Sequence, residues 1–89
     1  MKYKCAIIDD EELARGLLEQ HLGHFGELEL VEVCASAIEA RQINFEEIDL
    51  LFLDIEMPVL KGTDFFKHLD STPAVIFTTA HREYALDGF

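Results

Sequence analysis

The sequence predicts an α/β domain whose core is a parallel β-sheet, and three observations lead to this prediction. Residues 50–53 are four apolar residues in succession, which is typical of a strand buried on both faces of a parallel sheet. Residues 5–8 form a second run of the same kind. Stretches with helical periodicity alternate with these runs, and such alternation favours right-handed crossovers between parallel strands.

The first third of the chain predicts a strand, a helix and a second strand. Tyr3 to Ile8 is the first strand. A helix follows from Glu11, with Asp10 as its N-terminal cap, and Gly23 and Gly26 end it. Leu28 to Ala35 alternates apolar and polar residues, as expected for a less buried strand at a sheet edge. The helix shows side chains that recur at helical spacing: Leu13, Leu17, His21 and Phe25, with Leu18 and Leu22 beside them.

A short second helix is expected from Ser36 onward. Ser36 and Glu39 have the spacing of a capping box, in which each side chain bonds the backbone N–H of the other residue. The third strand then runs from Asp49 to Leu53. The candidate inward residues of the second helix are Ile38, Ala40 and Ile43.

The remaining residues predict a loop, two helices and a fourth strand. Pro58 and Gly62 bracket the loop. We find no internal repeat, linker or second domain, so a single domain over residues 1–89 is expected. The predicted elements are a helix from Thr63 to Leu69, a turn at Ser71 to Pro73, a strand from Ala74 to Thr78 and a helix that begins near Arg82.

The composition limits the possible partners and compartments. The net charge of −11, from 18 acidic and 7 basic residues, argues against nucleic-acid binding by this segment. No signal region is present, and no apolar run approaches the roughly 18 residues of a membrane span. Cys5 and Cys34 lie in apolar runs and are expected to be reduced, buried thiols. These features predict a cytoplasmic protein without membrane contact.

Acidic residues follow two of the predicted interior strands. Asp9 and Asp10 end the first strand, and Asp54 ends the third. Because ligands bind at the carboxyl edge of open α/β sheets, the three carboxylates are expected to meet at one rim. Such a cluster suits a hard divalent cation, which prefers oxygen ligands. We expect Mg²⁺ with Asp10 and Asp54 as direct ligands, Asp9 acting through water, and the backbone carbonyl of Glu56 as a further donor.

A carboxylate at this rim can also act as a nucleophile and form an aspartyl phosphate. Asp54 is the best candidate because it stands alone at its strand end. Thr79 follows the fourth strand, so its hydroxyl is placed to bond a phosphoryl oxygen, and Ala80 is small enough to let that group approach. Thr78 alternates away from Thr79 and is the weaker candidate. The plainer interpretation of a single Asp after a strand is a turn former or a helix cap.

These motifs resemble the receiver domain of two-component response regulators over essentially the whole chain. The matching residues are Asp9-Asp10-Glu11, then Asp54-Ile55-Glu56-Met57-Pro58 with Gly62, then Thr79-Ala80. The resemblance implies a flavodoxin-like doubly wound parallel sheet of order 2-1-3-4-5. It implies that Asp54 takes the phosphoryl group from a sensor histidine kinase, that Asp9 and Asp10 hold Mg²⁺, and that Thr79 is the switch hydroxyl. It implies no enzyme activity beyond assistance to the domain's own phosphotransfer and dephosphorylation.

The last twelve residues, 78–89, resemble receivers that precede a LytTR-type DNA-binding domain, which implies an output in transcription regulation. Receivers of this family continue through a fifth strand and helix, with a Lys-Pro whose lysine contacts the phosphoryl group. The expected sheet is therefore 2-1-3-4 with strand 5 and helix 5 missing, in a C-terminally truncated domain. Lys61 and Lys67 cannot be assumed to replace that lysine. An apolar edge strand over residues 74–78 predicts a homodimer or aggregation.

Two other classes of function remain open. One is an interaction module with the receiver fold that is not phosphorylated, and Mg²⁺ titration separates the two because a binding module need not bind the metal. The other is a metal-dependent phosphatase with an aspartyl nucleophile, in which Glu56 would be the second acid. The paired Asp9-Asp10 and the Met57-Pro58 continuation fit the phosphatase poorly.

Overall fold

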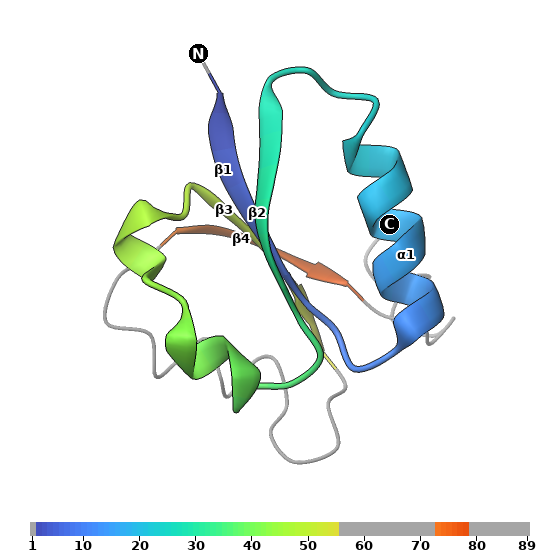
Figure 1. Ribbon diagram of the computed structural model, residues 1–89, viewed down its shortest axis with the longest axis vertical. Coiled ribbons are helices and arrows are strands. Elements are labelled where there is room, and N and C mark those ends of the chain that lie inside the picture. The colour runs from blue at the N-terminus through green and yellow to red at the C-terminus, as the bar shows by residue number, and fades with distance from the viewer. Residues whose placement is uncertain (1, 56–72, 79–89) are drawn as a thin grey trace.

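The computed structural model describes residues 2–55 and 73–78, which build a four-stranded parallel sheet of order β2-β1-β3-β4. This is the predicted order (Figure 1). The predictions for 56–72 and 79–89, including the helix from Thr63 and the helix near Arg82, lie outside the described residues. The elements are β1 (Tyr3–Ile8), α1 (Glu12–Leu22), β2 (Leu28–Cys34), the 3₁₀ turns η1 (Glu39–Gln42) and η2 (Phe45–Glu47), β3 (Leu50–Asp54) and β4 (Ala74–Thr78).

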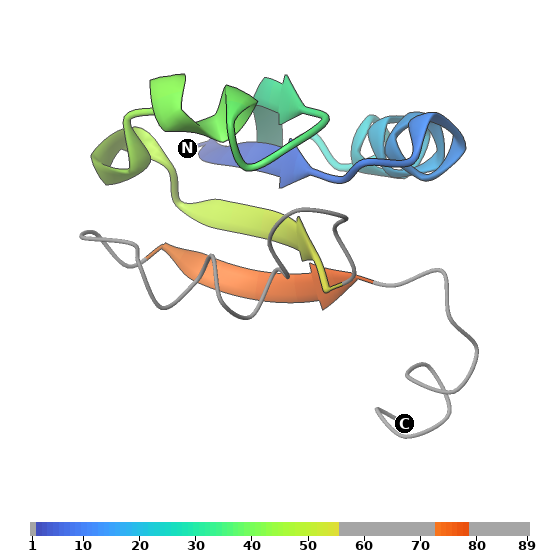
Figure 2. The ribbon, with the colours of Figure 1, turned by 90° about the horizontal axis from the view of Figure 1, so that it is seen from below.

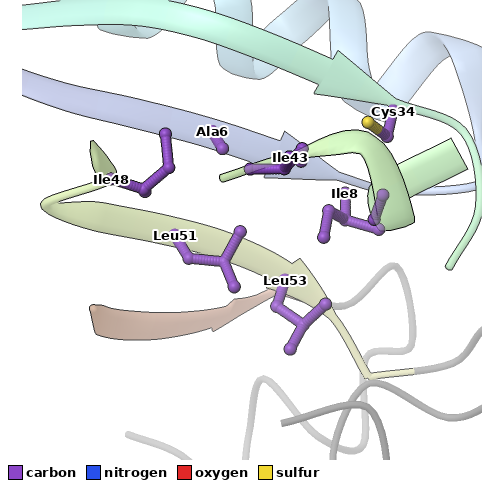
Figure 3. Packing of buried hydrophobic residues seen from close by; sticks show 8 residues of the cluster. Ala6, Ile8, Cys34, Ile43, Ile48, Leu51 and Leu53 are labelled. Atoms are coloured by element: carbon purple, nitrogen blue, oxygen red, sulfur yellow. The ribbon is translucent and has the colours of Figure 1, made fainter. Parts of the chain in front are cut away.

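The sheet is covered on both faces, by α1 on one side and by the two 3₁₀ turns on the other (Figures 1 and 2). The alternation of side chains along the interior strands supplies both cores. Under α1 lie Cys5, Ile7 and Phe52, packed with Leu22. The residues of the opposite core come from β1, β2, β3 and the turns: Ala6, Ile8, Cys34, Ala40, Ile43, Ile48, Leu51 and Leu53 (Figure 3).

The prediction that the two apolar runs are strands buried on both faces is confirmed. Residues 5–8 of β1 and 51–54 of β3 are all buried, with no alternation between buried and exposed positions. β2 lies at an edge of the sheet, as its alternating sequence predicted. β1 and β2 change register between Cys5 and Ala6, and this bulge leaves Val31 without a register partner on β1.

The helix α1 differs from its prediction at its start and on its buried side. It begins at Glu12 with Glu11 as its cap residue, and Asp10 is not the cap. Leu13 and Leu17 are 83% and 58% exposed, whereas Leu22 is buried and Leu18 packs against the sheet. At 3.6 residues per turn the two apolar stripes lie about a third of a turn apart, so a flat sheet buries only one of them.

The predicted second helix is replaced by the two short turns. One bond of the predicted capping box forms, because the Glu39 amide donates a hydrogen bond to Ser36 Oγ over 3.1 Å, but η1 begins only at Glu39 with Ile38 as its N-cap residue. Ala40 and Ile43 are buried as predicted, but Ile38 is 62% exposed. Ile43 and Asn44 are extended, and the Asn44 side chain accepts a 3.2 Å hydrogen bond from the Glu46 amide. This local bond starts a new turn and offers the backbone an alternative to a continuous helix.

The third strand is shifted by one residue from its prediction, because Asp49 forms hydrogen bonds with Lys4 just before the strand begins. Its amide donates to the Lys4 carbonyl over 2.8 Å, and its Oδ2 accepts from the Lys4 amide over 2.8 Å. β3 therefore begins at Leu50 and includes Asp54 as its last residue. This shift places Asp54 inside the ladder, in register with Thr78 of β4.

Candidate functional site

The carboxyl ends of β1 and β3 bring three acidic side chains together. Ile8 and Leu53 are register partners in the parallel pair, so the residues that follow them, Asp9 and Asp54, emerge side by side. Carboxylate oxygens of Asp9, Asp10 and Asp54 all lie within 4.8 Å of one another. The sequence predicted this meeting, and the sheet order confirms it.

The three carboxylates differ in their exposure to water. Asp9 and Asp54 are only 4% and 5% exposed, while Asp10 is the more open of the three. Buried carboxylates require hydrogen bonds, ion pairs or metal ions to offset the loss of hydration. Like charges at this separation also oppose one another. A cation between them removes both costs, so the donor set fits a hard divalent ion such as Mg²⁺.

Asp9 is fixed by hydrogen bonds from three directions. Its amide donates to the Cys34 carbonyl at the end of β2 over 3.0 Å. Its Oδ1 accepts from the Glu11 amide over 2.9 Å, a local turn that orients the carboxylate before α1 begins. Its carbonyl accepts from Arg15 Nη1 over 2.7 Å. The side chain that bonds the start of α1 is therefore that of Asp9, where the sequence favoured Asp10.

Arg15 is the residue near this rim that sequence reasoning missed. One signal was available, because a basic residue in the first turn of a helix is unfavourable against the positive end of the helix dipole. Such a residue is expected to have a local partner, and four acids lie within the six positions before it.

The β4 side of the rim is described only as far as Thr78. Its carbonyl accepts from the Ile55 amide over 2.9 Å, so the ladder continues past Asp54. The Thr78 Oγ1 atom is buried and has no hydrogen-bond partner in the part of the chain that the structure describes. Thr79 and Ala80, predicted to contact the phosphoryl group, and Glu56, predicted to offer its carbonyl, lie outside the described residues.

The family model of the response regulator receiver domain matches residues 5–88. The chain belongs to this family. Receiver domains of two-component systems accept phosphoryl groups and interact with histidine kinases. No helix within residues 2–55 and 73–78 is long and apolar enough to cross a membrane.

Two relatives show how much of a response regulator the chain represents. An uncharacterized response regulatory protein of Shewanella oneidensis is 40% identical over 88 residues, which cover 96% of this chain and 37% of the relative. The transcriptional regulatory protein BtsR of Salmonella typhi is 40% identical over 89 residues, with coverages of 97% and 37%. The receiver domain described here thus spans little more than a third of the length of these relatives.

The solved structures agree with the sheet order. The response regulator TrrA of Thermotoga maritima, in complex with Mg²⁺ and BeF, has a TM-score of 0.78 and is 31% identical. The match covers 98% of this chain and 76% of that one. The fold is therefore the flavodoxin-like fold of receivers, as predicted, and the described part contains four of its strands.

Proposed function

We propose that this receiver domain takes a phosphoryl group from the phosphohistidine of a sensor histidine kinase onto Asp54. The observation that carries the proposal is the cluster of three carboxylates within 4.8 Å at the carboxyl rim, two of them buried. Asp54 is the acceptor because it is the last residue of a strand packed between two others, which fixes its backbone. Asp9 and Asp10 follow β1 on a loop and are placed to hold a cation beside it.

The transfer requires one bond to form and one to break. An oxygen of the Asp54 carboxylate attacks phosphorus, the P–N bond to the kinase imidazole breaks, and its electron pair stays on that nitrogen. The other ring nitrogen of the phosphohistidine carries a proton in this step, so the products are an aspartyl phosphate and a neutral histidine. Mg²⁺ would be held by Asp10 and Asp54 directly, by Asp9 through water and by the Glu56 carbonyl, and when bound it would neutralise charge on the phosphoryl oxygens. Asp9 contributes through a carboxylate already oriented by the Glu11 amide.

The consequences of phosphorylation belong to the same proposal. The modification adds about −1.5 to −2 units of charge at a rim that already holds three acids. Thr79 is proposed as the hydroxyl that senses the group and biases the surface of the chain beyond β4. The output is proposed to be transcription regulation through a LytTR-type DNA-binding domain in the whole protein, and its compartment to be the cytoplasm. The similarity to BtsR, a transcriptional regulatory protein, supports this direction.

The test is labelling with acetyl phosphate in the presence and absence of Mg²⁺, with intact mass as the measurement. The protein is expected to gain one phosphoryl group only with Mg²⁺, and Asp54→Asn to gain none. Asp49→Asn is the matched control, because Asp49 lies just before the amino end of the same strand and is exposed. The side-chain amide oxygen of the introduced asparagine can still accept the hydrogen bond from the Lys4 amide, so this control keeps the contact at the start of β3.

Three other results would redirect the assignment. Persistent labelling of Asp54→Asn would refute Asp54 as the acceptor. A protein that neither binds Mg²⁺ nor gains mass would be an interaction module with the receiver fold. Hydrolysis of a generic phosphate ester over many turnovers would indicate a phosphatase, against our proposal that the domain is not an enzyme beyond its own phosphotransfer and dephosphorylation.

A further inference from the structure

We propose that Arg15 is a positioning residue of the acidic rim, which holds Asp9 in the place that cation binding needs. This inference rests on the function proposed above. It assigns to the first turn of α1 a role in metal affinity, although Arg15 itself is a cation and no ligand. The role follows from three features: the hydrogen bond that Arg15 makes, the burial of the residue it holds, and the charge it brings to the rim.

The hydrogen bond is short and charge-assisted. Arg15 Nη1 donates to the Asp9 carbonyl over 2.7 Å, at the short end of the range for a charged nitrogen donor. The backbone of Arg15 is itself anchored, because its amide donates to the Glu11 carbonyl over 3.0 Å in the first turn of α1. The side chain therefore reaches back from a fixed helical turn to the loop that bears the acids.

Asp9 has little freedom once this bond is made. Its amide is tied to β2 through Cys34, its carboxylate to the Glu11 amide and its carbonyl to Arg15. Asp9 is almost fully buried, so loss of the arginine leaves its carbonyl without the donor that the fold provides. The Asp9 carbonyl belongs to the peptide unit that leads to Asp10. Rotation of that unit moves both carboxylates relative to Asp54.

Because Arg15 is positively charged, the direction of the change in Mg²⁺ affinity distinguishes a positioning role from a purely electrostatic one. A cation near three carboxylates competes electrostatically with a bound metal ion, so removing only its charge would tighten Mg²⁺ binding. Removing its hydrogen bond loosens the ligand arrangement and weakens binding. Glu11 and Glu12 at the start of α1 are acids, and the other arginine within residues 2–55 and 73–78, Arg41, lies on η1.

The experiment is a calorimetric titration of Mg²⁺ into metal-free protein. Arg15→Ala is expected to weaken Mg²⁺ binding about tenfold, within the range for groups that orient metal ligands. Arg15→Lys, which keeps the charge and can donate through its ammonium group, is expected to restore most of the affinity. Arg41→Ala is the matched control, because Arg41 is exposed on η1 and its loss changes the net charge equally.

A second measurement keeps the test independent of the metal and of global stability. Amide hydrogen exchange of Glu11 in metal-free protein reports the hydrogen bond to Asp9 Oδ1. Arg15→Ala is expected to accelerate that exchange while the amides of β1 keep their protection. If Arg15→Ala does not fold, Arg15→Met takes its place, since methionine keeps most of the side-chain length and has neither an N–H donor nor a charge; it is then expected to weaken Mg²⁺ binding and to accelerate the Glu11 exchange in the same way.

The outcomes separate this inference from the function it rests on. Mg²⁺ affinity in Arg15→Ala equal to or above that of wild type would overturn the positioning role, while wild type still binds the metal and is labelled. Equal weakening in Arg15→Lys and Arg15→Ala would also overturn it. Absence of Mg²⁺ binding in wild type would refute the proposed function itself and the inference with it.

Discussion

The two interior strands of this sheet differ from the two edge strands in how deeply their side chains are buried. β1 and β3 are buried on both faces, and the acids of the rim follow or end these two strands. β4 is partly exposed along its length, with Ile76 and Phe77 at 46% and 40% exposure. Figure 2 shows β4 as the outermost strand, next to β3. The acids of the rim therefore lie at the ends of the two most deeply buried strands.

The two edges also differ from one another. β2 carries Glu29 and Glu32, and its bulge at Val31 interrupts the regular ladder. Charges and bulges are the usual means by which an edge strand avoids pairing with another chain. β4 has the sequence AVIFT, without a charge. We therefore expect substitutions in the interior strands to change mainly the free energy of unfolding, and substitutions in β4 to change mainly self-association.

The largest expected effect comes from truncating an interior side chain. Leu51→Ala in β3 removes a fully buried side chain from the core under the 3₁₀ turns, and should lower the free energy of unfolding by about 2–5 kcal/mol. Ile76→Ala in β4 removes a half-exposed side chain and should cost less than about 1 kcal/mol. Urea unfolding followed by circular dichroism measures both. Equal losses would show that β4 is as well packed as β3.

The next effect concerns association through the β4 edge. We expect the chain to form homodimers or larger aggregates at high concentration, because the edge is apolar and uncharged. Ile76→Lys should weaken self-association by about tenfold or more, equivalent to roughly 1.4 kcal/mol. Val31→Lys on β2 is the control and should leave it unchanged. Sedimentation velocity is the measurement, and a clean monomer of the wild-type chain at high concentration would contradict the prediction.

The contrast between interior and edge also explains what the sequence could predict. Runs such as residues 5–8 and 50–53 are unambiguous because both faces of an interior strand are apolar, and the meeting of the carboxylates then follows from parallel topology alone. The helical stripe of Leu13 and Leu17 was misjudged because α1 offers two apolar stripes and only the packing chooses between them.

The finer features of the rim depend on hydrogen bonds that no periodicity encodes. Asp9 and Asp10 are equivalent in sequence, and only the turn geometry decides that Asp9 bonds the Glu11 amide. The bond from Arg15 links residues six positions apart through a long, flexible side chain. The helix expected after Ser36 is replaced by two 3₁₀ turns: the Glu39 amide bonds Ser36 Oγ as predicted, but the side-chain bond of Asn44 competes with a continuous helix.

A smaller effect is expected from the two thiols, one interior and one at the end of an edge strand. Burial, and next the charge of Asp49, raise the pKa of the Cys5 thiol; burial, and next Glu32 and Glu39, raise the pKa of Cys34. The folded chain therefore holds these protons to higher pH than the unfolded chain does. Their contribution to stability is fully present below the unfolded pKa, near pH 8.5, and is lost as pH rises through the folded pKa.

The measurement for the thiols is the free energy of unfolding between about pH 8 and 10.5, under reducing conditions. The wild-type chain should lose stability across this window more steeply than Cys5→Ala/Cys34→Ala does. The double variant starts from lower stability because it loses buried volume, so the slopes are compared and not the absolute values. Parallel slopes would show that the thiols titrate alike in the folded and unfolded chains.

The smallest effect is expected where the interior and the edge meet, at Thr78 beside Asp54. Its hydroxyl is buried without a partner among the described residues, so Thr78→Val, which keeps the shape and removes the hydroxyl, should raise the free energy of unfolding by about 1 kcal/mol. Thr78→Ser keeps the hydroxyl and should not stabilise. Because Thr79 is the proposed switch residue, labelling of Asp54 should survive in Thr78→Val. Loss of stability together with loss of labelling would mean that the Thr78 hydroxyl serves the rim, and the switch role would then move from Thr79 to the residue that pairs with Asp54 in the ladder.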